Sequence, residues 1–132
     1  MYNHSGNSRA TWLEVKNDTD QQIQIKISEV DNSDWDGDSR PDHNFQNAII
    51  EAHQSKKERQ ELNAHNQTAE FTMTVSQGGN EQFAIRINQW DARIDSLSPI
   101  HEKDADCSNN FHVHIIGGLG GGDTLFVTIT KK

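Results

Sequence analysis

Five segments of the chain alternate apolar and polar residues with a period of two. They are 22–27 (QIQIKI), 71–75 (FTMTV), 83–87 (FAIRI), 111–115 (FHVHI) and 125–129 (LFVTI). Successive side chains of a β-strand point to opposite faces, so this period predicts strands with one buried and one solvated face. The segment 11–15 (TWLEV) follows the same pattern, with Leu13 and Val15 expected to face inward.

Short polar or glycine-rich segments separate these predicted strands. They are 17–20 (NDTD), 76–80 (SQGGN) and 117–122 (GGLGGG). The paired glycines of 76–80 accept positive φ, which favours a hairpin connection. Six or seven short strands without a visible repeat or linker predict an all-β fold, a single-domain antiparallel β-sandwich. We assign residues 11–132 to this domain and residues 1–10 to a flexible N-terminus.

Three further segments have a weaker pattern. Residues 47–52 (NAIIEA) fit either a short strand or a helical turn. Residues 55–65 (SKKERQELNAH) have helix-forming composition but only one aliphatic anchor, Leu62, and we interpret them as a charged turn plus an edge strand. Residues 91–109 contain few core residues, so we expect a long irregular loop there, a kind of segment that often carries function.

The balance of charge narrows the classes of ligand. The 132-residue chain carries a formal net charge of -8. Nucleic-acid binding requires clustered Lys and Arg to neutralise phosphates, so we expect no nucleic-acid partner. The same charge disfavours attraction to an anionic lipid surface. A neutral or zwitterionic lipid, a glycan and a protein remain open as ligands.

The cysteine content and the first residues bear on the compartment. A single cysteine, Cys107, excludes an intrachain disulfide. Residues 1–12 lack the apolar core of a secretory signal, and no apolar run approaches the length of a membrane span. We therefore expect a soluble protein made in the cytosol without a signal peptide, with release and action on target-cell membranes left open.

The segment 31–43 (DNSDWDGDSRPDH) is rich in aspartate. Alternating carboxylates followed by a further one are a ligand set that Ca²⁺ accepts from a single loop. The candidate calcium ligands are Asp34, Asp36, Asp38 and Asp42. Ser39 stands where such loops favour glycine, and no glutamate follows at the distance of a bidentate ligand. A calcium site and a solvated acidic turn are therefore both retained as interpretations.

The three tryptophans are candidate contacts for a lipid or a sugar. Trp35 lies in the acidic loop, where it either folds back onto the sandwich or is displayed for a ligand. Trp90 falls one residue out of the inward register of 83–87, and with Asp91 it begins the long loop. Trp12 completes the set. Aromatic side chains with a polar tip suit a lipid interface or the face of a sugar ring.

The residues that commonly carry enzyme chemistry do not form a recognisable pattern. His112 and His114 fall on one strand face, and without a following glutamate we interpret them as solvated positions rather than metal ligands. Acidic neighbours are expected to raise the pKa of Cys107. The glycine run 117–122 lacks the Lys-Ser/Thr ending of a phosphate-binding loop. We therefore do not expect an enzyme.

The order of these segments resembles that of the aegerolysin family over about residues 10–132. The matching segments are 15–27 (VKNDTDQQIQIKI), the Trp-bearing acidic loop, 69–75 (AEFTMTV), 83–91 (FAIRINQWD), the long loop, the glycine run and the closing 127–132 (VTITKK). The shorter motifs are DGD at 36–38, Trp-Asp at 90–91 and TITKK at 128–132. Length and acidity also agree with the family.

Two features depart from the aegerolysin pattern. The Cys-Gly-Arg-x-Asp segment of the family is replaced by 63–71 (NAHNQTAEF), and the second Trp after Trp-Asp is missing, since Ile94 follows in WDARIDS. These segments belong to the neighbourhoods that recognise lipid in fungal members, so the fungal lipid specificity is not transferred to this chain.

The resemblance implies a small β-sandwich that performs no chemistry and binds a membrane lipid or a cell-surface receptor. Such proteins commonly act with a larger pore-forming partner protein. We therefore expect the binding component of a two-component insecticidal or cytolytic toxin. Its expected target contacts are Trp35, Trp90, Asp91 and Trp12.

A carbohydrate-binding lectin is the alternative function. In this interpretation the 34–42 aspartate loop holds Ca²⁺ and a tryptophan stacks on a sugar. No other cofactor is expected. An edge strand would also allow a homodimer, because its unpaired backbone groups can pair with a second copy.

Overall fold

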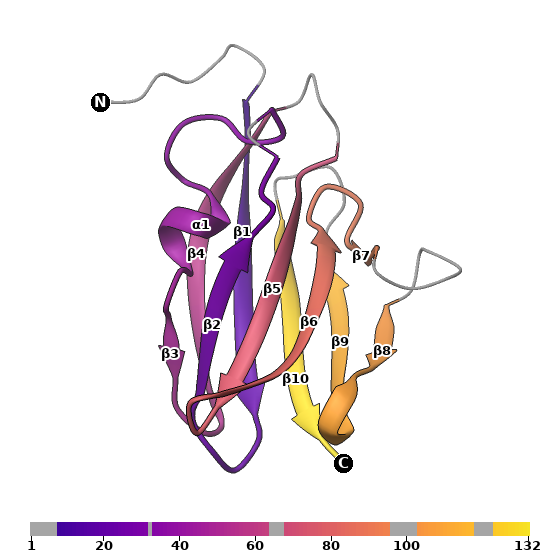
Figure 1. Ribbon diagram of the computed structural model, residues 1–132. Helices are drawn as coiled ribbons and strands as arrows, with labels where there is room; N and C mark the ends of the chain where they lie inside the picture. Colours follow the sequence, from indigo (N-terminus) through magenta and orange to yellow (C-terminus); the bar gives the residue numbers. More distant parts are fainter. Residues whose placement is uncertain (1–7, 32, 64–67, 96–102, 118–122) are drawn as a thin grey trace.

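Two five-stranded sheets pack face to face in the computed structural model, which describes residues 8–31, 33–63, 68–95, 103–117 and 123–132 (Figure 1). The first sheet has the order β4 (Gln54–Asn63), β1 (Ser8–Asp18), β10 (Thr124–Lys131), β9 (Phe111–Gly117) and β8 (Asp104–Asp106). The second has the order β3 (Ile49–Ile50), β2 (Ile23–Ser28), β5 (Glu70–Gln77), β6 (Asn80–Asn88) and β7 (Arg93–Ile94). The chain is thus a β-sandwich, as predicted.

The apolar positions of the period-two pattern form the core between the sheets. The predicted inward residues of all six segments are buried, among them Leu13, Ile25, Phe71 and Val127. Phe83 and Phe111 meet across the sheets, with ring centroids 5.1 Å apart. The predicted hairpin is also confirmed, because Gly78 and Gly79 join β5 to β6 with φ values of 58° and 80°.

One sheet is mixed, which corrects the prediction of a purely antiparallel sandwich. Strand β1 pairs with β10 in parallel, from Trp12 opposite Thr124 to Asp18 opposite Thr130. In Figure 1 the two strands run side by side toward the end that carries the C-terminus. The alternation of side chains is the same in both strand directions, so the period could not reveal this pairing. We call the sheet that contains β1 and β10 the mixed sheet.

The weaker segments resolve into short elements. Residues 49–50 form β3, and residues 54–63 form one continuous edge strand, β4, without the predicted charged turn. The expected long loop 91–109 is interrupted by β7, β8 and a 3₁₀ turn, η1 (Ser108–Asn110), while 96–102 lie outside the described residues.

The structure also shows where the first strand begins and where the chain forms a short helix. Strand β1 begins at Ser8, three residues before the predicted start of the domain, and residues 1–7 and 118–122 lie outside the described part. One short helix, α1 (Pro41–Asn44), follows the acidic loop. Among the described residues, no helix has the length and apolar character needed to cross a bilayer.

Candidate functional site

Trp35 is a core residue, which corrects the interpretation that the acidic loop displays it. Its side chain is 4% exposed and tilts against Phe71, with ring centroids 6.1 Å apart. The loop attaches to the free edge of β4: the Asp36 amide donates to the Glu61 carbonyl at 3.0 Å, and Trp35 bridges Leu62. This edge pairing turns the indole inward.

The four aspartates of the loop do not converge on a common point. Asp34 is 1% exposed and accepts hydrogen bonds from the Thr68 hydroxyl and, at 3.0 Å, from the Glu70 amide. Asp42 pairs with Arg40, whose Nε lies 2.6 Å from Oδ1. No group of three His, Cys, Asp or Glu within the described ranges has an arrangement that could hold a metal ion. The Asp34 and Asp42 carboxylates thus help to fasten this part of the chain.

Trp90 and Asp91 occupy a turn after β6. Trp90 is half-buried and packs against the core. The Asp91 amide donates to Oδ1 of the buried Asn88 at 3.0 Å, and its carboxylate lies 3.4 Å from Arg93. The role of these two residues in binding stays a prediction.

Trp12 is the tryptophan that faces solvent. It lies on the outer face of the mixed sheet, 40% exposed, with Lys57 Nζ 5.3 Å from its ring centroid. Phe126 and Ile116 lie on the same face at 38% and 58% exposure, and they are directly opposite one another in the β10–β9 pairing. We call Trp12, Phe126 and Ile116 the apolar patch.

Sequence reasoning missed two members of the apolar patch, although a signal was present. Phe126 and Ile116 both occupy outward positions, next to the inward Leu125 and Ile115. A large apolar residue on the polar side of an alternating strand departs from the pattern of a solvated face. Their proximity to Trp12 depends on the β1–β10 pairing, which the sequence does not show.

An ionic cluster lies below the apolar patch on the same face. His112 is held on both ring nitrogens, with Nδ1 2.9 Å from Asp106 and Nε2 2.9 Å from Asp104. His114 Nδ1 lies 2.8 Å from Asp104, and Lys132 Nζ lies 2.6 Å from Asp106. We call these five residues the His–Asp cluster. The two histidines face outward, as predicted, and each lies within hydrogen-bonding distance of an aspartate.

The close contacts of the cluster shift its titration. Hydrogen bonds that His112 donates to Asp106 and Asp104 raise the pKa of His112 above its ordinary value. Hydrogen bonds from His112 and His114 lower the pKa of Asp104, and those from Lys132 and His112 lower the pKa of Asp106. The carboxylates therefore stay ionised through the range in which imidazoles titrate.

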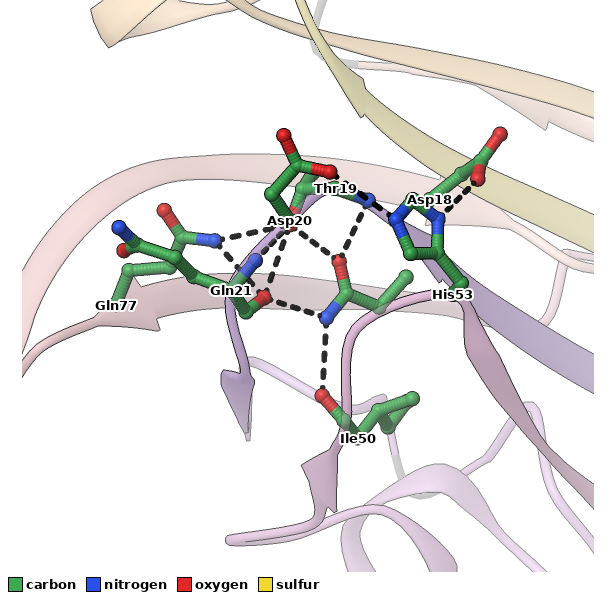
Figure 2. A network of polar contacts seen from close by, with 8 residues as sticks. Asp18, Thr19, Asp20, Gln21, Ile50, His53 and Gln77 are labelled. Atoms are coloured by element: carbon green, nitrogen blue, oxygen red, sulfur yellow. Dashed lines mark hydrogen bonds and ion pairs between the residues drawn. The ribbon is translucent and has the colours of Figure 1, made fainter.

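His53, beside the β1–β2 turn, also contacts an aspartate through each ring nitrogen (Figure 2). His53 lies with Nδ1 2.9 Å from Asp18 and Nε2 3.1 Å from Asp20, and both contacts raise its pKa. Beside it, the Gln77 side-chain amide donates to the Thr19 hydroxyl at 3.0 Å. These bonds close the β1–β2 turn.

A polar hollow of about 370 Å³ adjoins this turn. Its walls carry hydroxyl, amide, carboxylate and ammonium groups, from Asp18, Thr19, Asp20, Gln21, Gln77, Lys131 and Lys132. A surface with this mixture of donors and acceptors can hold a small polar molecule. Trp12, Trp35 and Trp90 are not among its lining residues.

Cys107 is poorly suited to act as a nucleophile. The thiol is half-buried, and burial, with a smaller contribution from Asp106, raises its pKa to about 11. The direction agrees with the sequence prediction, although burial rather than acidic neighbours is the main cause. The thiolate form that attacks electrophiles is therefore scarce at neutral pH.

The fold is that of aegerolysin-family proteins. IP-1A from Alcaligenes faecalis superposes with a TM-score of 0.52 at 15% identity, over 96% of this chain and 94% of that chain. RahU, solved in complex with a TRIS molecule, superposes with a TM-score of 0.53 at 11% identity, over 92% and 96%. Both are aegerolysin-family proteins. No protein-family model matches this chain, and no curated protein matches it in sequence.

The comparisons thus define a class of fold, an aegerolysin-like β-sandwich. At these identities the likeness concerns the fold alone. The roles of individual residues must be argued from this chain's own surface.

Proposed function

We propose that this protein binds a membrane lipid or a cell-surface receptor through the apolar patch and has no enzymatic activity. One observation carries the proposal. Of the four large hydrophobic side chains exposed in the described part of the chain, three form this patch, on adjacent strands of one sheet face. Exposed apolar groups that gather on one face commonly mark a membrane or protein interface.

The composition of the patch suits the boundary between headgroups and acyl chains. An indole has an apolar body and a polar N–H, which favours this boundary. Lys57, over the Trp12 ring, can extend its ammonium toward the headgroups while its stem stays on apolar surface. The net charge of -8 favours neutral or zwitterionic headgroups at neutral pH.

The second part of the proposal is that a larger pore-forming partner completes the activity, as in a two-component toxin. The aegerolysin-like fold supports this part. A small sandwich that only docks should bind vesicles without releasing an entrapped dye. Dye release by this protein alone would contradict a requirement for a partner.

The test of the binding face is vesicle binding followed by tryptophan fluorescence. Phosphatidylcholine vesicles, with and without sphingomyelin and sterol, should cause a blue shift of emission. The shift should disappear in Trp12→Phe, because Trp35 is already buried in the free protein. An unchanged shift in Trp12→Phe would contradict docking through this face.

A matched pair of isoleucines gives the control. Ile116→Ser changes the patch, whereas Ile49→Ser removes a similarly exposed isoleucine from β3 of the other sheet. We expect weakened binding only in the first variant. Equal effects would show that general surface hydrophobicity, rather than this patch, drives binding.

A lectin is the second candidate function, and the polar hollow beside the β1–β2 turn is the observation that favours it. Hydroxyl-rich ligands need the donors and acceptors that line it, and RahU binds TRIS, a hydroxylated amine. The calcium-assisted form is less well supported, since the loop aspartates do not converge. A glycan array, repeated with Asp20→Asn and with added Ca²⁺, tests this function.

A further inference from the structure

We propose that acidification increases the affinity of the outer face of the mixed sheet for anionic lipid surfaces, through a reversal of charge in the His–Asp cluster. This inference rests on the proposed function, because it assigns a regulation and a lipid charge to the same face.

The reversal follows from the groups that the cluster brings together. With both imidazoles neutral, Lys132 is the one cation beside two carboxylates, Asp104 and Asp106. With both imidazoles protonated, three cations stand beside the same two carboxylates. The local charge therefore changes from negative to positive when His112 and His114 gain protons.

The cluster and the apolar patch form one continuous surface. His114 and Ile116 lie on the same side of β9, two residues apart. Phe126 and Thr128 likewise lie on the same side of β10. Side chains two residues apart on a strand are separated by about 7 Å. This spacing brings His114 within the Debye length of about 8 Å at physiological salt, and His112 lies two residues further along the same side of β9, under any flat surface that covers both the patch and the cluster.

Charges on the neighbouring strands do not cancel the change. On β1, Glu14 lies opposite Phe126, Lys16 opposite Thr128 and Asp18 opposite Thr130, and Asp18 also contacts His53, a further imidazole that the double variant described below leaves in place. Hydrogen bonds from His112 and His114 lower the pKa of Asp104, and those from Lys132 and His112 lower the pKa of Asp106, so these carboxylates do not take up the protons first. The side chains of His112 and His114 are 25% and 47% exposed, which leaves them open to solvent and to a facing bilayer.

The experiment compares two lipid charges at two pH values. The full chain is mixed with vesicles of phosphatidylcholine alone, or with about a third phosphatidylserine, at about pH 8 and about pH 5.5. Each cation gained near an anionic surface strengthens binding, so protonation within the cluster should tighten binding to the anionic vesicles about tenfold or more. Binding to phosphatidylcholine should change little.

A substituted chain and a matched control identify the groups responsible. The double variant His112→Gln/His114→Gln should lose the response to pH and keep its binding to phosphatidylcholine. The control is His43→Gln, which removes an exposed imidazole beside Asp38 in the loop at the opposite end. The control should keep the full response. Near-ultraviolet circular dichroism checks that each variant is folded, and His114→Gln alone, at the more exposed position, should show a reduced response.

The outcomes separate this inference from the proposed function. Trp12-dependent binding that is the same at both pH values would overturn this inference alone. A full response in the folded double variant would overturn the assignment to the cluster. Absence of binding to every vesicle at both pH values would overturn the proposed lipid-binding function as well.

Discussion

The outer faces of the two sheets differ, although the same alternation builds both. On the sheet containing β5, the outward positions of the three long strands are small or polar, such as Lys26, Thr72, Thr74 and Arg86, and the large apolar exception is Ile49 on the two-residue edge strand β3. Arg86 pairs there with Glu70 at 3.3 Å, as is usual for a solvated face. On the mixed sheet, Trp12, Phe126 and Ile116 occupy equivalent outward positions.

The inward positions show no such difference, because both sheets contribute aliphatic and aromatic side chains to one core. The comparison teaches that the fold depends on the inward positions of each strand, whereas the binding surface depends on the outward positions. Inward residues stabilise the sandwich, whereas outward residues can vary without loss of the core. An outward aromatic patch therefore calls for an explanation other than stability.

The largest expected effect separates a core tryptophan from a surface one. Trp35→Ala should lower the free energy of unfolding by about 3–5 kcal/mol, because it leaves a cavity beside Phe71. Trp12→Ala should change it by only about 0.5 kcal/mol, as is usual on a surface. Urea unfolding measures both values. Similar losses in the two variants would contradict the assignment of Trp12 to a free face.

A milder change at the same site sharpens this contrast. No described residue accepts a hydrogen bond from Trp35 Nε1, which is buried. Trp35→Phe removes this unpaired donor while keeping an aromatic ring, so it should cost much less than Trp35→Ala.

The next effect tests the apolar patch as a unit. Each half-exposed side chain should contribute about 1 kcal/mol on transfer to a bilayer interface, so Trp12→Ser/Ile116→Ser/Phe126→Ser should weaken vesicle binding about a hundredfold. Co-sedimentation with phosphatidylcholine vesicles measures the change. The matched chain is Thr72→Ser/Thr74→Ser on the other face, which should bind like the unmodified protein. A loss in the matched chain would remove the distinction between the faces.

A smaller effect is expected where the acidic loop is fastened. Asp34→Ala leaves the Glu70 amide and the Thr68 hydroxyl without their partner, which should cost about 1–3 kcal/mol of stability. Thermal unfolding with and without Ca²⁺ measures this cost. If the loop instead binds calcium, Ca²⁺ should raise the Tm of the unmodified chain and not that of the variant.

The smallest expected effect is the dependence of stability on pH. The folded state raises the pKa of His53 and His112, so their contribution is complete below about pH 6.5 and is lost as the pH rises through the folded pKa. The folded state lowers the pKa of Asp18, Asp104 and Asp106. The contribution of these aspartates to stability is therefore present above about pH 4 and is lost on further acidification.

Both contributions coincide between about pH 4 and about pH 6.5, where the Tm should be highest. Most of these groups are exposed, and His112 is partly so, and solvent screening therefore keeps the change small. His53→Gln/His112→Gln should flatten the decline in Tm from about pH 6 to about pH 8. An equal decline in this variant and in the unmodified chain would contradict the assignment.

Much of the fold could be predicted because its signals are local. The alternation in 22–27, 71–75, 83–87, 111–115 and 125–129 identified strands and their buried faces, and the structure confirms each of them. The glycine pair at 78–79 likewise identified a hairpin between neighbouring strands. These features depend on the chemistry of adjacent residues alone.

The candidate site was harder to predict because it depends on contacts between distant segments. The polar residues around Trp35 suggested that its side chain is exposed for a ligand. They could not reveal that its loop pairs with the edge of β4. The positions of His112 opposite Asp106 and of His114 opposite Asp104 follow from the β8–β9 pairing, which the sequence does not show.

By itself, the sequence determined a β-sandwich with a defined core and an acidic charge. Only the tertiary structure decided which tryptophan faces solvent and which residues surround it. The physical reason is the parallel pairing of β1 with β10, the described strands farthest apart in the sequence. Strand alternation specifies which face a side chain occupies, whereas its neighbours on that face are set by long-range strand pairing.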